Sequence, residues 1–118
     1  MSIKTAIVGY GFSAKTFHIP FITTSDAFCF DSVSSSQRAS VIKDWPEVNH
    51  YQTAEEMITQ SNSDLVIITA PNDVHYALAK LALEQGKHVL IEKPFVTRSQ
   101  EGEALIKLAK EKGLLLSV

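Results

Sequence analysis

The chain has 118 residues, of which 45 % are hydrophobic and 20 % are charged, and its formal net charge is -2. This composition excludes a disordered chain and favours one folded domain with a modest core. A nucleic-acid surface needs clustered Lys and Arg, and no basic stripe is visible, so we expect no nucleic-acid partner. No apolar run reaches membrane-spanning length and no signal-peptide pattern opens the chain, so we expect no membrane partner and a cytoplasmic location.

A strand followed by a glycine turn opens the chain. The apolar run 3–8 predicts the strand, and Gly9, Gly11 and Ala14 follow it in the pattern G-x-G-x-x-A. This arrangement is typical of a dinucleotide-binding domain. Gly9 permits the sharp turn, Gly11 lets a pyrophosphate approach the backbone, and Ala14 lets the helix pack closely on the strand. The first N–H groups of that helix would then face the anion.

The helix after this turn is expected to begin near Ser13, and Pro20 should end or kink it, because proline removes a helical donor. The single cysteine, Cys29, lies in an apolar stretch and is expected to pack as a small hydrophobe. We then expect a strand, a short helix and a very short strand over residues 28–34, 39–45 and 50–51.

Thr53 opens the second half of the chain with a capping box, because Glu56 stands three residues after it. The apolar run 65–70 suits a central parallel strand that is covered on both faces. Gly86 is placed to end the helix that follows. We expect helices over residues 54–60, 74–85 and 97–113, and strands over 65–70, 89–91 and 114–118.

Strands that alternate with helices at these intervals imply right-handed crossovers. The sequence therefore predicts an α/β fold with a doubly wound, parallel, six-stranded sheet of the Rossmann type. With the glycine turn after the first strand, the predicted strand order is 3-2-1-4-5-6. All 118 residues are expected to form this one dinucleotide-binding domain, which leaves none for a substrate-binding domain.

Several motifs in this chain occur together in one known family. They are the opening G-Y-G-F-S-A-K, the P-N-x-x-H after the fourth strand, the G-K-H-V before the fifth strand and the E-K-P after it. In this combination the chain resembles the nucleotide-binding domain of the Gfo/Idh/MocA oxidoreductases, and the resemblance covers essentially all of it. The resemblance implies pyridine-nucleotide-dependent oxidation or reduction of a sugar, polyol or related hydroxyl compound.

The resemblance also assigns cofactor-binding residues by position. It implies that the pyrophosphate is cradled by Gly9, Tyr10, Gly11, Phe12, Ser13 and Ala14. It implies that the nicotinamide half lies beside Ala70, Pro71, Asn72 and His75. As alternatives, His75 is a surface capping residue, and His18 and His88 are structural, while His50 is expected to be a loop residue. No two histidines stand at metal-ligand spacing, so no metal site is expected.

The E-K-P motif carries the catalytic hypothesis. It places Lys93 at the carboxyl end of a strand, where open α/β sheets bind ligands. The resemblance implies that Lys93 reaches the nicotinamide and the substrate, where it would assist proton transfer, and that Glu92 and Pro94 shape the turn. The alternatives are that Lys93 is a surface lysine and that Glu92 only satisfies backbone donors.

The residues at the end of the second strand bear on the choice of cofactor. NAD-binding domains usually place an acid there to bind the ribose 2′-hydroxyl, but this chain has Ser34, Ser35 and Ser36, and Asp31 stands three residues too early. Serines and Arg38 could instead hold a 2′-phosphate, although Arg38 could equally be solvated. The sequence therefore favours NADP over NAD.

The leading hypothesis is an NAD(P)-dependent oxidoreductase that acts on a small molecule and is represented here by its cofactor domain. Family members supply further catalytic groups from a C-terminal domain, and the full-length protein is expected to be a homo-oligomer. The alternative is a non-catalytic nucleotide-sensing or regulatory module. The intact E-K-P favours the enzyme.

Overall fold

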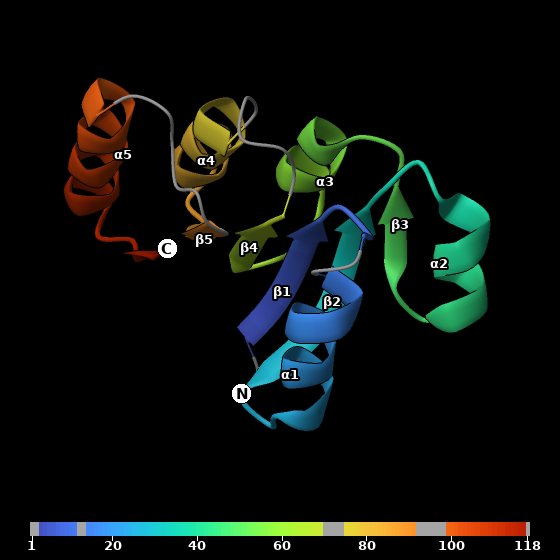
Figure 1. Ribbon diagram of the computed structural model, residues 1–118. Helices are drawn as coiled ribbons and strands as arrows, with labels where there is room; N and C mark the ends of the chain where they lie inside the picture. Colours follow the sequence, from blue (N-terminus) through green and yellow to red (C-terminus); the bar gives the residue numbers. More distant parts are fainter. Residues whose placement is uncertain (1–2, 12–13, 70–74, 92–98, 118) are drawn as a thin grey trace.

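The structure is a computed structural model, and it describes residues 3–11, 14–69, 75–91 and 99–117. Its centre is a six-stranded sheet in the order β3-β2-β1-β4-β5-β6, and every pair of neighbouring strands is parallel (Figure 1). This confirms the predicted Rossmann topology. The strands are β1 (Ile3–Val8), β2 (Phe28–Ser34), β3 (Asn49–Tyr51), β4 (Leu65–Ile68), β5 (His88–Ile91) and β6 (Leu116–Ser117).

Helices cover both faces of the sheet, as a doubly wound fold requires. One face carries α3 (Ala54–Gln60), α4 (His75–Glu84) and α5 (Ser99–Lys112). The other face carries the helical turn η1 (Ala14–His18), α1 (Ile19–Thr24) and α2 (Arg38–Asp44). Figure 1 shows α3, α4 and α5 in a row on one side of the strands, with α1 on the opposite side.

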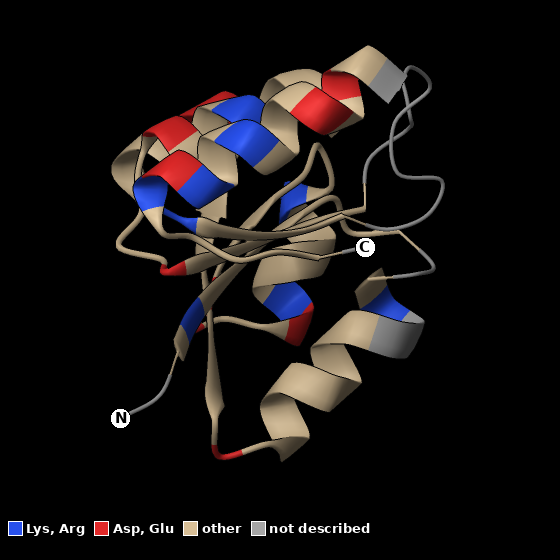
Figure 2. Cartoon of the chain, turned by 90° about the vertical axis from the view of Figure 1, so that its left-hand side faces the viewer, with Lys and Arg blue, Asp and Glu red and all other residues tan. Residues whose placement is uncertain are grey.

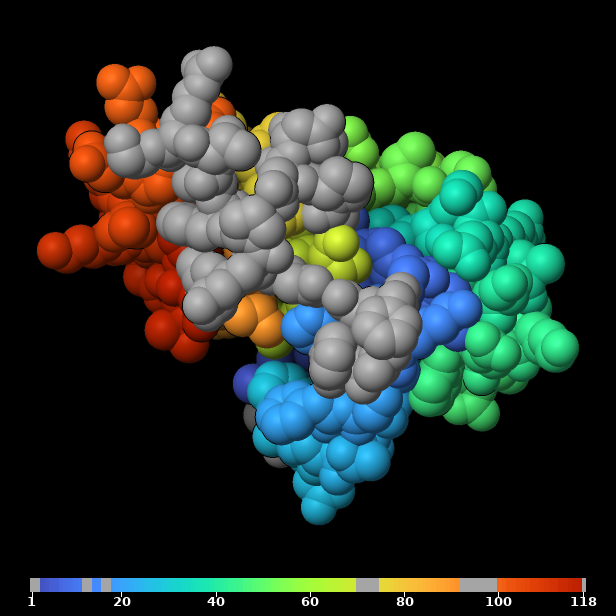
Figure 3. Space-filling model, viewed as in Figure 1, coloured from blue at the N-terminus to red at the C-terminus, as the bar shows by residue number. Residues whose placement is uncertain are grey.

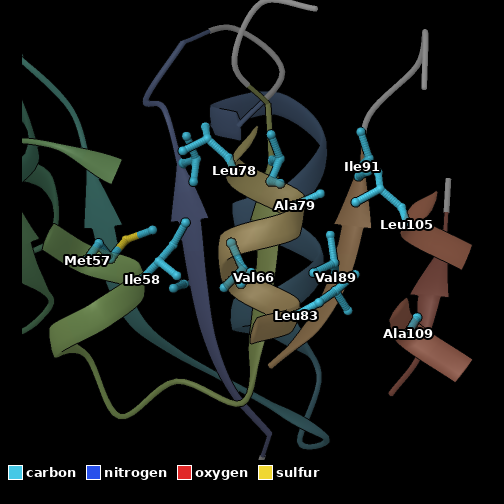
Figure 4. Close-up of a cluster of buried hydrophobic side chains, with 14 residues drawn as sticks. Met57, Ile58, Val66, Leu78, Ala79, Leu83, Val89, Ile91, Leu105 and Ala109 are labelled. Carbon is cyan, nitrogen blue, oxygen red and sulfur yellow. The ribbon is translucent and has the colours of Figure 1, made fainter. Parts of the chain in front are cut away.

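Alternation along the central strands divides the core into two clusters. Ala6 and Val8 face the α3–α5 side, whereas Ile7, between them, faces the α1–α2 side. Figure 4 shows the first cluster, in which side chains of α3, α4 and α5 meet those of β4 and β5. In β4, Val66 and Ile68 belong to this cluster and Ile67 belongs to the cluster on the α1–α2 side. Both faces of β4 are therefore buried, which explains why its sequence is a continuous apolar run.

The helix after the glycine turn has an unexpected geometry. Its first five residues, Ala14–His18, form a π-helical turn, and the regular α-helix begins at Ile19. Pro20 lies in the first turn of α1, directly after the π-helical turn. Of the two expected effects of Pro20, the end of the helix is wrong, because α1 continues to Thr24.

Helix ends elsewhere follow the sequence signals. The Thr53 hydroxyl accepts a hydrogen bond from the Glu56 N–H at 3.2 Å and so caps α3. Gly86 has a φ of +79° after α4, and Gly113 has a φ of +67° after α5, so both glycines allow the left-handed turn that ends a helix. Among the described residues the last strand begins at Leu116, two residues later than predicted, and Leu116 and Ser117 pair with β5.

The prediction that Cys29 packs as a small hydrophobe is wrong, because its side chain is exposed. It lies near the start of β2, where the run Phe28, Cys29, Phe30 has no alternation that would assign a buried face. The register of β2 against β1 also shifts here, since Thr5 pairs with Phe30 and the next residue of β1 pairs with Ser32. The extra residue at this bulge is Asp31.

Lys87 is a buried cation directly before β5, with only 7 % of its surface exposed. Its ammonium donates to the carbonyl of Ser61 at 3.1 Å and to that of Ser63 at 2.7 Å. Burial lowers the pKa of Lys87, although Asp64 and Asp31 partly oppose that shift. The contact joins the chain after α3 to the chain after α4.

Charged residues of the two signs are interspersed along the helices (Figure 2). The view reveals no stripe of one sign on that side of the described chain. Among the described residues, none of the helices combines the length and the apolar character that crossing a membrane requires.

Candidate functional site

The glycine turn lies at the carboxyl edge of the sheet, between the ends of β1, β2 and β4. Gly9 has a φ of +96°, and its N–H donates to the carbonyl of Ser34 at 2.8 Å. A Cβ on Gly9 would lie 2.7 Å from the hydroxyl oxygen of Thr69, the residue after β4. Glycine is therefore required here for both its backbone angle and its size.

Gly11 meets a different condition, because a Cβ built on it has no neighbouring atom within 4 Å. The backbone at Gly11 is thus open to the outside, as the approach of a pyrophosphate would require. Ala14 is completely buried and packs with Ile7 and Tyr10 on the α1–α2 face. These positions have the shapes that the G-x-G-x-x-A pattern predicts, and their contact with a cofactor stays a prediction.

The side chain of Tyr10 is almost entirely buried beside the glycine turn. The ring is 3 % exposed, and its hydroxyl donates to the Asp44 carboxylate at 2.5 Å. Burial, and then the hydrogen bond to Asp44, raise the pKa of Tyr10 to about 12. The Lys15 ammonium lies 4.6 Å from the ring centroid. The Tyr10 side chain therefore anchors the turn, and its contact with a cofactor stays a prediction.

A cavity of about 310 Å³ opens beside the glycine turn, and we call it the turn cavity. It brings together three of the predicted residues, Gly9, Ser34 and Ser35. Its volume lies at the lower end of the range of small-molecule sites, about 300–1,000 Å³. Its other lining residues are Val8, Gln52, Ala54, Glu55, Ala77 and Leu78.

The chain after β2 is held by its main chain. Ser34 is buried, and its carbonyl accepts the Gly9 hydrogen bond described above. The Ser35 N–H donates to the carbonyl of Tyr51 at 3.1 Å, and the Ser35 hydroxyl accepts from the N–H of Gln37 at 2.9 Å. The loop at the predicted ribose end of the site is thus ordered by protein contacts.

Arg38 lies next to the turn cavity rather than in it. It is the first residue of α2, is exposed, and lines a second cavity of about 380 Å³, the edge cavity. Gln52 lines both cavities, which makes them neighbours. In Figure 3 the teal and green atoms around α2 and α3 lie beside blue atoms from the N-terminal part of the chain. The edge cavity is lined by Arg38, Ile42, Val48, Asn49, His50 and Gln52.

Asp31 stays away from the ribose end, because it occupies the bulge of β2, three residues before the strand ends. Its carboxylate accepts a hydrogen bond from the Ser32 hydroxyl at 2.5 Å. The carboxyl end of β2 therefore has serines where an NAD-binding domain usually has an acid.

His75 is the first residue of α4 and is only 1 % exposed, so the alternative of a surface capping residue is wrong. Its place beside the nicotinamide stays a prediction. The remaining predicted residues lie outside the described residues; they are Phe12, Ser13, Ala70, Pro71, Asn72, Glu92, Lys93 and Pro94. Within the described ranges, no three His, Cys, Asp or Glu side chains gather in a way that could hold a metal ion.

Sequence reasoning missed several lining residues of the two cavities. Gln52 and Glu55 follow the carboxyl end of β3, and applying the strand-end rule to that short strand would have found them. Ala77 and Leu78 had no such signal, because small and apolar residues in a helix are ordinarily core. His50 is not among the predicted site residues, yet it lines the edge cavity.

Comparison with known proteins agrees with this geometry. Residues 3–118 match the Gfo/Idh/MocA family, described as "Oxidoreductase family, NAD-binding Rossmann fold". The chain belongs to this family. The match covers the glycine turn, both cavities and all six strands, so the chain is an NAD(P)-binding domain of an oxidoreductase family.

Three relatives illustrate the similarity. The chain is 40 % identical over 117 residues to the uncharacterized oxidoreductase YdgJ of Escherichia coli, covering 99 % of this chain and 34 % of YdgJ. It is 37 % identical over 117 residues to scyllo-inositol 2-dehydrogenase (NADP(+)) IolW of Bacillus subtilis, covering 99 % of this chain and 33 % of IolW. A crystal structure of a putative oxidoreductase from Klebsiella pneumoniae superposes with a TM-score of 0.94 at 43 % identity, covering 99 % of this chain and 34 % of that one. The chain thus spans about a third of the length of the curated relatives it matches.

Proposed function

We propose that the protein is an NAD(P)-dependent oxidoreductase acting on a polyol, a sugar or a related hydroxyl compound. The observation that carries this proposal is the turn cavity, which joins Gly9 to Ser34 and Ser35 at the carboxyl edge of a Rossmann sheet. This edge is where open α/β sheets bind dinucleotides. When bound, the nicotinamide of the cofactor supplies the hydride acceptor or donor.

The described residues fit such a cofactor in two ways. The open backbone at Gly11 leaves room for the pyrophosphate, next to the tight turn at Gly9. The turn cavity would hold the adenosine, with its ribose near Ser35. Glu55 lies in the same cavity, and its carboxylate could accept a hydrogen bond from the adenine amino group.

We further propose that NADP is preferred over NAD. The carboxyl end of β2 has Ser34 and Ser35 in place of an acid, and Arg38 stands at the neighbouring edge cavity. A guanidinium can make two parallel hydrogen bonds to a phosphate. A relative with 37 % identity is named as an NADP-dependent scyllo-inositol dehydrogenase.

Lys93 is our candidate for proton transfer. It is the second residue of the E-K-P motif and comes two residues after Ile91, the last residue of β5. Its ammonium would donate a hydrogen bond to the substrate oxygen, while Glu92 and Pro94 shape the turn. The substrate would be enclosed by a second domain, since the chain spans about a third of its curated relatives. We also propose a cytoplasmic, homo-oligomeric full-length protein, by which we mean the natural polypeptide that contains these residues.

The test is a turnover assay of the full-length protein. Inositols and related polyols are offered with NAD⁺ or NADP⁺, and reduced nicotinamide is followed by its absorbance. We expect substrate-dependent reduction, faster with NADP⁺ at limiting cofactor. A Gly11→Leu variant is the control, because it should lose turnover with every substrate. Cofactor binding without turnover on any compound would favour the alternative, a nucleotide-sensing module.

A further inference from the structure

His50 makes a contact that the dinucleotide-binding pattern does not predict. It lies in the edge strand β3, opposite Val33 of β2. Its ring Nε2 lies 2.7 Å from the carbonyl oxygen of Ser35. A carbonyl only accepts, so Nε2 carries the proton and donates this hydrogen bond. The ring therefore holds the main chain of the loop that follows β2.

Ser35 is fixed on three sides as a result. Its N–H donates to the carbonyl of Tyr51, its carbonyl accepts from His50, and its hydroxyl accepts from the N–H of Gln37. Two of these partners belong to β3, a strand of three residues at the edge of the sheet. Of the two, only the His50 contact depends on a side chain, so a substitution can remove it without altering the ladder.

His50 also stands between the two cavities. Ser35, which it holds, lines the turn cavity, whereas His50 lines the edge cavity together with Arg38. No Asp or Glu is among the residues that line the edge cavity. A lining with a guanidinium and an imidazole and without a carboxylate favours an anionic group.

We infer that His50 is a specificity-determining positioning residue that adapts the loop at Ser35 to the 2′-phosphate of NADP. The inference rests on the proposed preference for NADP. With Ser35 held in place, a ribose in the turn cavity has its 2′-substituent directed toward the edge cavity and Arg38. A ribose with a free 2′-hydroxyl needs no such placement, so His50 acts on NADP and little on NAD.

The test uses two probes that differ only in the 2′-phosphate, adenosine 2′,5′-bisphosphate and 5′-AMP, titrated calorimetrically into the full-length protein. His50→Phe keeps a ring but removes the donor. We expect this variant to bind the bisphosphate about 3- to 10-fold more weakly, the range for one lost hydrogen bond. Its affinity for 5′-AMP should stay within about twofold of the wild type. His50→Gln keeps an N–H donor and should retain most of the affinity for the bisphosphate.

His88→Phe is the matched control. It makes the same chemical change at the start of β5, where the ring Nδ1 accepts a hydrogen bond from the N–H of Leu115. Thermal unfolding of each variant records any loss of stability. If His50→Phe weakens the binding of both probes equally, or of neither, the inference about His50 is overturned and the NADP proposal still stands. A wild-type protein without preference for the bisphosphate would overturn the NADP proposal, and the inference with it.

Discussion

Gly9 and Thr69 approach so closely that a Cβ atom on Gly9 would lie 2.7 Å from the Thr69 hydroxyl oxygen. That hydroxyl donates to the carbonyl of Val8 at 2.6 Å, and the Thr69 N–H donates to the same carbonyl at 3.2 Å. Thr69 is thus held by two hydrogen bonds and cannot move aside without losing them. The contact joins the ends of β1 and β4 at the point where we propose that the pyrophosphate binds.

Gly9→Ala should therefore destabilise the fold. The φ of +96° disfavours a side chain, and the added methyl group meets Thr69. We expect a loss of about 2 kcal/mol or more in the free energy of unfolding, measured by urea denaturation. Gly11→Ala is the control, because nothing lies within 4 Å of its added Cβ. Equal denaturation midpoints for Gly9→Ala and the wild type would contradict this assignment.

Gly11→Leu should have the opposite effect, a loss of cofactor binding without a loss of stability. The side chain would project into the space that the pyrophosphate needs, while no neighbouring protein atom opposes its Cβ. We expect dinucleotide binding to be abolished in calorimetry and the unfolding midpoint to stay close to that of the wild type. Unchanged affinity would show that the phosphates do not approach this turn.

Arg38→Ala should reduce the affinity for NADP and leave that for NAD unchanged. A hydrogen bond between charged groups contributes about 1.5–3 kcal/mol, and the exposed position of Arg38 lowers this, so we expect a loss of about tenfold. The difference between wild type and variant should shrink as salt is raised. Lys43→Ala removes another exposed cation of α2 and serves as the control. A retained preference for NADP in Arg38→Ala would count against the guanidinium contact.

Lys87→Met tests the buried cation. The change leaves the carbonyls of Ser61 and Ser63 without this donor, so we expect a loss of about 2 kcal/mol in the free energy of unfolding. The pH dependence has a definite sign. The pKa of Lys87 is lowered in the folded state, so the unfolded state binds more protons as pH approaches 10.5.

Stability of the wild type should therefore rise relative to Lys87→Met as the pH increases from the lowered pKa toward that ordinary value of 10.5. Below both pKa values the difference between the two proteins should be constant. Urea denaturation of both proteins at several alkaline pH values measures this. A difference that does not change with pH would mean that the ammonium keeps its ordinary pKa when folded.

Lys93→Met tests the proposed proton transfer in the full-length protein. Met is similar in length and uncharged, so turnover should fall by about 10²–10⁴-fold, the range for lost acid–base assistance. Cofactor affinity should change much less, because the ammonium acts on charge that develops during hydride transfer. Steady-state kinetics and a cofactor titration measure the two effects. Turnover within a few-fold of the wild type would assign the proton to another group.

Most of the fold could be predicted because its signals are local. The apolar run of β4, the Thr53 cap and Gly86 each act within a few residues of the chain. The exposure of Cys29 could not be predicted, because it depends on how β2 pairs with β1 around the bulge. The burial of His75 likewise depends on its tertiary surroundings, which the spacing of residues does not reveal.

The candidate site was predictable where one motif supplies it. Gly9, Gly11 and Ala14 have the geometry that their pattern implies. The cavities, in contrast, are completed by Gln52 and Glu55 from a separate part of the chain. Local sequence patterns do not reveal which residues the strand order brings together.

The π-helical turn Ala14–His18 has a consequence for the length of this segment. Ala14 and Ile19 are five residues apart, yet both are buried against the same face of the sheet. An ordinary helix, with about 3.6 residues per turn, would bring residues four apart to one face. A chain with one residue fewer between them could thus form an unbroken α-helix on the same sheet. Alignments of this segment should place a one-residue gap there, and homologues of either length are compatible with one fold.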